Sequence, residues 1–318
     1  MKNNNFKKRK TFVRTSFFAA IISIILFIYF FSSINIVRSK SFKIDENQDI
    51  KIANNVPKNY LSWGMKSINY NNLELKKHVN IKIALLDSGV NEHKDLNGVV
   101  KATKNFTNSD EKDNLNHGTP IAGILASNNN LKGILNDIDI YNAKVINDNG
   151  SIEEENIINA IDWAIEKDID IINMSFGFKH PSKKLENKIN YAVQKNIIIV
   201  ASAGNRYGLN TDYPAKYENV ISVGSIDSNL ELSKFNPDGK IDFLAPGEKI
   251  LSTCNMGEYK LYTGTSFSAP FVTGIIGRYL SASNIKKDEH RFEKVYKHLL
   301  KHSTKKLFNN NFNIIQCD

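Results

Sequence analysis

The feature that most constrains the fold is a regular alternation of short apolar runs with segments of helical pattern. Several of these runs lack the apolar–polar alternation of a half-buried strand, as expected for parallel strands that are covered on both faces. Strands joined through helices predict an α/β fold, with a mainly parallel β-sheet and helices on both faces. The expected strands are Lys82–Asp87, Asp139–Ile146, Ile169–Ser175, Ile197–Ala203, Val220–Ser225 and Ile241–Ala245, and the expected helices are His117–Ala126, Glu153–Lys167, Lys183–Lys195 and Ser266–Ser281.

Four polar residues fall where such a sheet places its active site, beyond the carboxyl ends of the strands. Asp87 ends an apolar strand, and Asn205 follows another in a Gly-Asn turn. His117 and Ser266 each open an expected helix. Each residue also has an ordinary structural explanation, such as a turn-forming Asp or a Ser that caps a helix. Taken singly, none of them indicates a function.

Together, the four side chains supply the groups that nucleophilic acyl transfer needs. A serine hydroxyl becomes a strong nucleophile only when a base takes its proton, and a neutral imidazole can do so near pH 7. A buried carboxylate fixes the imidazole tautomer, and an amide with a backbone N–H can stabilise the oxyanion. The combination therefore indicates a hydrolytic site.

In these residues and the motifs around them, the chain resembles the subtilisin family of serine proteases, peptidase family S8. The resemblance rests on ALLDSGV, NHGTPIAGILAS, NMSFG, IIIVASAGN, YPAKYENVISVGSID, FLAPG and GTSFSAPFVTG, across roughly residues 58–282. It implies a subtilisin-like fold, with Ser266 as nucleophile, His117 as general base and Asp87 as the residue that orients His117. This Asp, His, Ser order along the chain is that of subtilisin. Asn205 is implied as the side-chain donor of the oxyanion hole.

The resemblance further implies a polypeptide substrate, which two edge strands would hold in extended form by backbone hydrogen bonds. Arg206 takes a position that borders the pocket for the residue before the scissile bond. It is either a solvated arginine or a group that disfavours basic residues there. The predicted substrate-binding residues are Gly150, Ser151, Ile152, Ser175, Phe176, Gly177, Gly204 and Arg206.

An apolar segment near the N-terminus predicts a membrane anchor. Residues 17–37 carry no charge over 21 positions, close to the ~20 residues that cross a bilayer as a helix. Six cations precede the segment and three follow it, which predicts a cytoplasmic tail at 1–15, a signal-anchor at 16–37 and an extracellular catalytic domain at the cell membrane. A cleaved signal peptide, giving a secreted protein, is the alternative, but the small residues of a cleavage site are missing.

The net charge of +9 does not indicate a nucleic-acid partner. The first 43 residues hold nine of the Lys and Arg and no acid, so the remaining 33 cations balance the 33 acids. Neither GxGxxG nor GxxxxGK[ST] follows an expected strand, which excludes a sheet-based nucleotide-binding protein. We expect a linker at 38–56, one peptidase domain at 57–302, a C-terminal tail at 303–318, and a monomer.

Two departures from the family concern metals and thiols. The stretch Ser127–Gly133 is short compared with the family's calcium-binding loop and holds no carboxylate, so we expect no cofactor and regard tight calcium binding as doubtful. Cys254, in an expected surface turn, and Cys317 are predicted to be unpaired thiols without a catalytic role. A disulfide between them is the alternative outside the cell.

The sequence therefore predicts a serine endopeptidase that works through an acyl-enzyme intermediate. A compact, membrane-tied member of the family, without calcium loop, prodomain or extra domains, is similar to the lantibiotic leader peptidases of Gram-positive bacteria. Two alternatives remain. One is a broad-specificity surface protease, and the other is a non-catalytic binding or immunity protein on the same scaffold. The presence of all four candidate residues argues against the second.

Overall fold

The computed structural model describes residues 50–52, 56–70, 79–136, 138–283, 285–307 and 311–317. The predicted cytoplasmic tail at 1–15 and anchor at 16–37 lie outside these residues, as does most of the predicted linker. Within the part that is described, no helix is long and apolar enough to cross a membrane. Residues 42–318 form one folded unit, which contains every described helix and strand.

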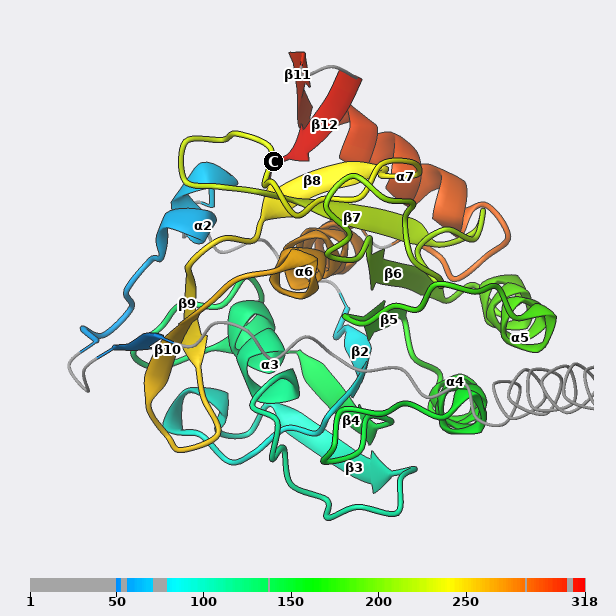
Figure 1. Cartoon of the computed structure of the whole chain (residues 1–318), viewed down its shortest axis with the longest axis horizontal. Helices are drawn as coiled ribbons and strands as arrows, with labels where there is room; N and C mark the ends of the chain where they lie inside the picture. Colours follow the sequence, from blue (N-terminus) through cyan, green and yellow to red (C-terminus); the bar gives the residue numbers. More distant parts are fainter. Residues whose placement is uncertain are drawn as a thin grey trace, which may run out of the picture. The chain divides into compact units, whose positions relative to one another are not determined.

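A large, mainly parallel sheet forms the centre of this unit (Figure 1). Its strand order is β11-β12-β8-β7-β6-β5-β2-β4-β3, and every pairing from β12 to β3 is parallel. The predicted α/β fold with a mainly parallel sheet is thus confirmed. The strands are β2 Lys82–Asp87, β3 Val100–Asn105, β4 Asp139–Lys144, β5 Ile171–Met174, β6 Ile198–Ser202, β7 Ile221–Ile226, β8 Phe243–Pro246, β11 Ser303–Leu307 and β12 Asn311–Ile315.

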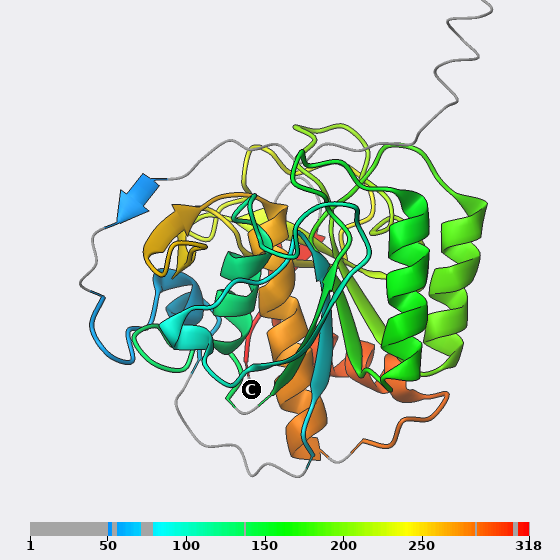
Figure 2. The same ribbon diagram turned by 90° about the horizontal axis from the view of Figure 1, so that it is seen from below.

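Helices cover both faces of this sheet, as the sequence predicts. Figures 1 and 2 show α4 and α5 on one face and α3 and α6 on the other. Alternate residues of β2 serve the two sides, because Ile83 packs into the core beneath α3 and α6, whereas Ala84 packs into the core beneath α4 and α5. The helices are α2 Trp63–Ser67, α3 Gly118–Ala126, α4 Glu154–Glu166, α5 Lys183–Gln194, α6 Thr265–Ser283 and α7 Arg291–Lys301, with a 3-10 turn at Lys94–Leu96.

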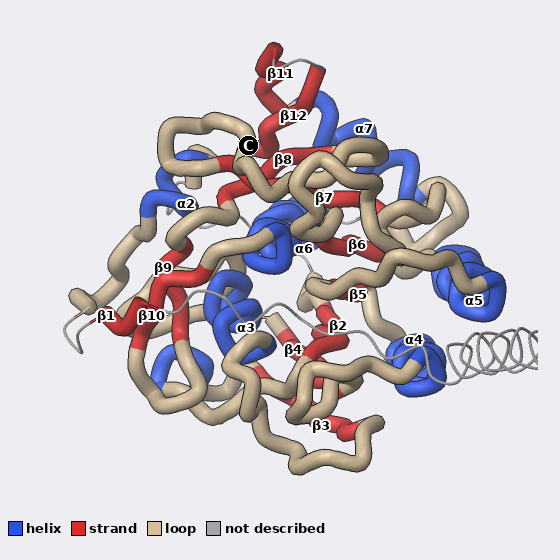
Figure 3. Tube along the Cα trace, in the orientation of Figure 1, coloured by secondary structure: helices blue, strands red, loops and turns tan. Residues whose placement is uncertain are grey.

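A second, small sheet was not expected from the sequence. It has the order β1-β10-β9, from β1 Ile50–Ile52, β9 Ile250–Thr253 and β10 Tyr259–Tyr262. Figure 3 shows it apart from the main sheet and next to α3. Cys254 directly follows β9 and is fully buried, so the predicted surface turn is wrong at this residue. No disulfide joins Cys254 to Cys317, which confirms the prediction of two thiols.

The predicted C-terminal tail is corrected by the structure, because β11 and β12 pair antiparallel at the edge of the main sheet. Ile314 pairs with Leu244 of β8 and is buried together with Ile315. The backbone N–H of Cys317 donates to the carbonyl of Ile68, 2.7 Å away. Only a few apolar residues mark this hairpin, and the Lys- and Asn-rich sequence around them hides the strand pattern.

Candidate active site

The first pair of candidate residues meets at the carboxyl end of β2. Asp87 is the last residue of this strand, and His117 precedes the first residue of α3. His117 Nδ1 lies 2.7 Å from Asp87 Oδ1, and both side chains are almost fully buried. The same carboxylate oxygen accepts a hydrogen bond from the Ser88 N–H at 2.8 Å. This is the geometry in which a carboxylate holds one tautomer and orientation of an imidazole.

A glycine permits this approach of helix to strand. A Cβ on Gly118 would lie 2.1 Å from the carbonyl oxygen of Gly89 and 3.2 Å from Asp87 Cβ. Any side chain at residue 118 would therefore push the start of α3 away from the end of β2. Since His117 is the neighbouring residue, its distance from Asp87 depends on this contact.

A second buried carboxylate, Asp113, supports the pair, and the sequence did not reveal it. Its Oδ1 accepts from the Ser88 hydroxyl at 2.7 Å and from the His117 N–H at 3.2 Å. Its Oδ2 accepts from the N–H and hydroxyl of Thr119, at 2.8 and 2.6 Å. Asp113 therefore satisfies N–H groups that the first turn of α3 leaves open, and fixes the residues on either side of the Asp87–His117 hydrogen bond.

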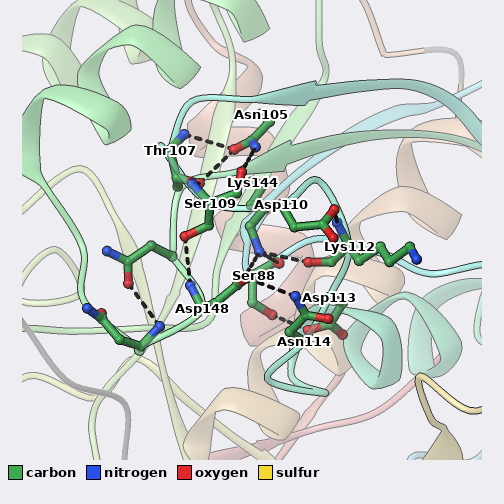
Figure 4. Close-up of polar contacts among 12 residues, drawn as sticks. Ser88, Asn105, Thr107, Ser109, Asp110, Lys112, Asp113, Asn114, Lys144 and Asp148 are labelled. Carbon is green, nitrogen blue, oxygen red and sulfur yellow. Dashed lines mark hydrogen bonds and ion pairs between the residues drawn. The ribbon is translucent and has the colours of Figure 1, made fainter.

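Lys144 belongs to the same cluster of polar contacts (Figure 4). It is fully buried at the end of β4, where it pairs with Asp87 of β2 in the sheet. Its ammonium group donates to the carbonyls of Ser88 and Lys112, each at 2.8 Å, and to Asp148 Oδ1 at 2.9 Å. These three bonds use all of its donors. The sequence gives little signal for this role, because β4 reads Asp-Ile-Tyr-Asn-Ala-Lys and already holds other polar residues.

Asp148 extends this network toward the predicted substrate-binding residues 150–152. Burial acts to raise the pKa of the Asp148 carboxyl, but hydrogen bonds from Lys144 and Asn114 outweigh it and hold the pKa below its ordinary value. Its backbone N–H donates to Ser109 Oγ at 3.1 Å. The loop before residue 150 is therefore tied to the loop that follows β3 and, through Lys144, to Ser88.

The second pair of candidates meets at the start of α6. Asn205 Oδ1 accepts from the N–H and hydroxyl of Thr265, at 3.0 and 3.1 Å. The Asn205 amide group Nδ2 faces Gly264, since a Cβ on that glycine would lie 3.0 Å from it. Ser266 is the second residue of α6 and is partly exposed. The Thr265 N–H is used by Asn205, but the Ser266 N–H in the same first turn has no acceptor within the helix, so it can act with the Asn205 amide on a developing oxyanion.

The two pairs adjoin through aromatic contact. The ring of His117 lies 5.5 Å from the ring of Phe267, centroid to centroid, and Phe267 is the residue after Ser266. The structure therefore brings all four candidate residues to one region, although the chain separates the first from the last by 179 positions (266 − 87).

The predicted substrate-binding residues lie beside these pairs but are not themselves strands. Residues 175–177 directly follow β5 without regular structure. Residues 150–152 belong to a turn, in which only Ile152 forms a β-bridge, with Ile146. Gly204 precedes Asn205, and its N–H donates to Thr265 Oγ1 at 3.1 Å. The resemblance implied edge strands at both segments, and the described structure shows no regular strand at either.

The loop at residues 127–133 packs on a buried carboxylate, Asp95. Asp95 Oδ1 accepts from the Asn130 N–H and the Tyr259 hydroxyl, and Oδ2 accepts from the Leu131 N–H at 2.7 Å. Burial and this carboxylate raise the pKa of Tyr259, so its hydroxyl remains a donor. Within the described ranges, no group of three or more His, Cys, Asp or Glu is placed to hold a metal ion.

A family model supports a relationship over most of the chain. The model of the subtilase family, Peptidase_S8, matches residues 78–316. The major intracellular serine protease of Bacillus subtilis is 37% identical over 249 residues, which cover 72% of this chain and 76% of that protein. Subtilisin E of Bacillus subtilis is 37% identical over 214 residues, or 64% of this chain. That match spans only 56% of subtilisin E.

Solved structures show the same fold. A cold-adapted subtilisin-like serine proteinase matches with a TM-score of 0.70 and 25% identity, covering 81% of this chain and 98% of that one. The nisin leader peptidase of Lactococcus lactis matches with a TM-score of 0.70 and 23% identity, covering 80% of this chain and 91% of that one.

Proposed function

Because this chain belongs to the subtilase family of serine peptidases, we propose that it is an endopeptidase that cleaves peptide bonds through an acyl-enzyme intermediate. The observation that carries the proposal is the hydrogen bond of 2.7 Å between the buried side chains of Asp87 and His117. An imidazole that is oriented by a carboxylate can act as a general base for a nearby hydroxyl. Ser266, at the start of α6, carries such a hydroxyl.

The mechanism assigns one role to each candidate. Ser266 Oγ forms a bond to the scissile carbonyl carbon while its proton passes to His117 Nε2. His117 then gives this proton to the leaving amine nitrogen as the C–N bond breaks. Asp87 stabilises the imidazolium in between. Asn205 Nδ2 and a backbone N–H of the first turn of α6 donate to the carbonyl oxygen while it carries negative charge. Water then hydrolyses the ester by the same steps in reverse.

The substrate, in this proposal, is an extended polypeptide. Residues 175–177 and 150–152 would pair with it on either side, each adopting strand geometry through those hydrogen bonds. The support is their position, since one segment continues from β5 and the other follows the loop that Lys144 and Asp148 anchor. The proposed reaction assigns its proton transfers and oxyanion stabilisation to the chain's own residues. The internal hydrogen bonds at both carboxylate oxygens of Asp95 support the proposal that the shortened loop holds no tight calcium site.

The finer proposal is that the enzyme removes a leader from an exported precursor, such as a lantibiotic, at the outer face of the membrane. The likeness of fold to a nisin leader peptidase and the uncharged segment at residues 17–37 support it. In this proposal residues 16–37 anchor the protein in the membrane.

A fluorophosphonate probe tests the activity directly. The full chain, Ser266→Ala and the control Ser281→Ala should each be treated with the probe, and the labelled residue found by mass spectrometry. Ser281 lies in the same helix but far from its start, so its loss should change nothing. We expect labelling of Ser266 in the wild type and the control and none in Ser266→Ala. A folded wild-type protein that resists the probe would contradict the proposal.

A further inference from the structure

An ion pair next to Asn205 is poorly satisfied on both sides. Arg206 Nε lies 3.4 Å from Asp212 Oδ1. Asp212 is only 8% exposed, yet its carboxylate accepts no hydrogen bond from any residue that the structure describes. Arg206 Nε is itself buried and likewise has no hydrogen-bond partner in the described chain. Buried charges normally have well-aligned partners, because removing them from water is costly. The pair therefore lacks a donor to the carboxylate.

Two glycines bring the main chain against this carboxylate. A Cβ on Gly204 would lie 2.4 Å from Asp212 Oδ2, and a Cβ on Gly177 would lie 2.7 Å from Asp212 Cβ. The backbone N–H of Asp212 donates to the carbonyl of Ala203 at 2.9 Å, which fixes its place. Asp212 therefore lies between the segment that ends in Gly177 and the segment that leads into Asn205.

This position is within reach of one particular residue of a substrate. In the proposed mechanism the scissile carbonyl oxygen lies at Asn205 Nδ2. The residue that precedes the scissile bond carries that carbonyl, so its side chain begins beside Asn205 and the neighbouring Gly204. A long side chain that extends from there past the two glycines meets the carboxylate of Asp212. Lysine or arginine would supply the missing donor together with a positive charge.

We propose that Asp212 selects lysine or arginine at the residue immediately before the scissile bond. The inference rests on the proposed endopeptidase activity and names the class of bond that it cleaves. Arg206 does not repel such a residue in this arrangement, because its charge is offset by the carboxylate that it contacts. The sequence alone left open that Arg206 disfavours basic residues, and it could not show the pairing with Asp212.

The protonation of Asp212 gives a second measurable consequence. Burial raises the pKa of this carboxyl, and the cations that face it, Arg206 and Lys179, only partly offset the effect. The carboxylate therefore becomes neutral at a higher pH than an ordinary Asp. The preference for a basic residue should weaken as the pH falls through this raised pKa, while the reaction with an uncharged residue should not share this loss.

The test uses diphenyl phosphonates that modify the serine and differ only in the side chain that precedes the reactive group. Lysine-like, norleucine-like and phenylalanine-like versions are compared on the full chain by the rate constant of Ser266 modification. We expect the lysine-like compound to react at least about tenfold faster than the norleucine-like one, and Asp212→Asn to abolish that ratio. Asp162→Asn is the matched control, because it removes a carboxylate that pairs with Lys188 between α4 and α5, far from Asn205.

The outcomes separate this inference from the proposed activity. Equal rates for the lysine-like and norleucine-like compounds on the wild type would overturn it, as would an unchanged ratio in folded Asp212→Asn. If Asp212→Asn does not fold, the wild-type ratio still decides, and Arg206→Gln gives a second reading. Without Arg206 the carboxylate has no cation beside it on that side, so the ratio should rise, and a fall would contradict the inference. Failure of the side-chain-free fluorophosphonate to label Ser266 would instead remove the proposed activity.

Discussion

The two halves of the candidate site are built in different ways. The half formed by Asp87 and His117, here the proton-transfer side, rests on the buried groups of Asp113 and Lys144, which make four and three side-chain hydrogen bonds. The half formed by Asn205 and Ser266, here the carbonyl side, has an exposed amide and a poorly satisfied ion pair next to it.

The difference fits the separate task that the proposed mechanism assigns to each half. Proton transfer needs donor and acceptor held at a fixed distance, and well-satisfied buried groups beneath them provide this rigidity. A group that receives a substrate must keep hydrogen-bonding capacity unused until the substrate arrives. The unsatisfied ion pair on the carbonyl side is therefore informative. The contrast concerns the supporting groups Asp113 and Lys144, because Asp87 Oδ2 is itself buried without a hydrogen-bond partner among the described residues.

The largest expected effect is on the proton-transfer side itself. His117→Ala removes the base, so kcat should fall about 10⁶-fold, the size known for the corresponding loss in subtilisin, a relative of this chain. Hydrolysis of a peptide substrate and urea unfolding would be measured together. An unfolding free energy within about 1 kcal/mol of the wild type would show that the loss is chemical.

Substitutions in the buried network beneath that side should cause the largest loss of unfolding free energy. Lys144→Met leaves the carbonyls of Ser88 and Lys112 and the carboxylate of Asp148 without their donor, so the unfolding free energy should drop by about 3–5 kcal/mol. Lys188→Met is the control, because its ion pair with Asp162 is partly exposed and should contribute less than about 1 kcal/mol. If urea titrations gave equal losses of unfolding free energy for the two variants, the buried network would be no more stabilising than the surface ion pair.

The carbonyl side should show the opposite balance of effects. Asn205→Ala should lower kcat by roughly 10²–10³-fold, again the size known for subtilisin, because an oxyanion donor is lost. It should cost only about 1 kcal/mol of unfolding free energy, for the two bonds from Thr265. Steady-state kinetics and thermal unfolding on one preparation would compare the two. A large loss of stability with little loss of rate would reverse the comparison.

Acidification should remove the stabilising contribution of Asp148 to the network beneath the proton-transfer side. The folded-state pKa of Asp148 is lowered, so its stabilising effect is present above the unfolded-state pKa and is lost as the pH falls through the folded-state value. Urea unfolding across this range should therefore show a smaller loss in Asp148→Asn than in the wild type. Identical pH profiles would separate Asp148 from the network.

The smallest expected effect is that of a chelator. Because Asp95 is satisfied by Asn130, Leu131 and Tyr259, excess EDTA should leave the melting temperature unchanged. Differential scanning calorimetry with EDTA and with added calcium checks this. A stabilisation by calcium would show that the loop at residues 127–133 opens to bind it.

The sequence predicted the parts of the molecule that depend on local pattern. Buried strands produce continuous apolar runs, and Asp87 and Asn205 were found because they follow such runs. The sequence did not predict β3, because this edge strand has the sequence Val-Lys-Ala-Thr-Lys-Asn and lacks an apolar run. Asp113, Lys144 and Asp212 look like ordinary polar residues in the sequence. Their roles arise from contacts between segments that only the fold brings together.

The hairpin that closes the main sheet bears on the order of biosynthesis. Strand β12 pairs with β8, and the Cys317 N–H donates a hydrogen bond to the Ile68 carbonyl. Residues that are synthesised after α7 therefore complete the main sheet, whose other strands come earlier in the chain. A nascent chain that already contains Ser266 still lacks strand β12. Assembly of the finished sheet therefore waits until translation has passed residue 317, and a nascent chain that already carries every reactive group is not yet a completed fold.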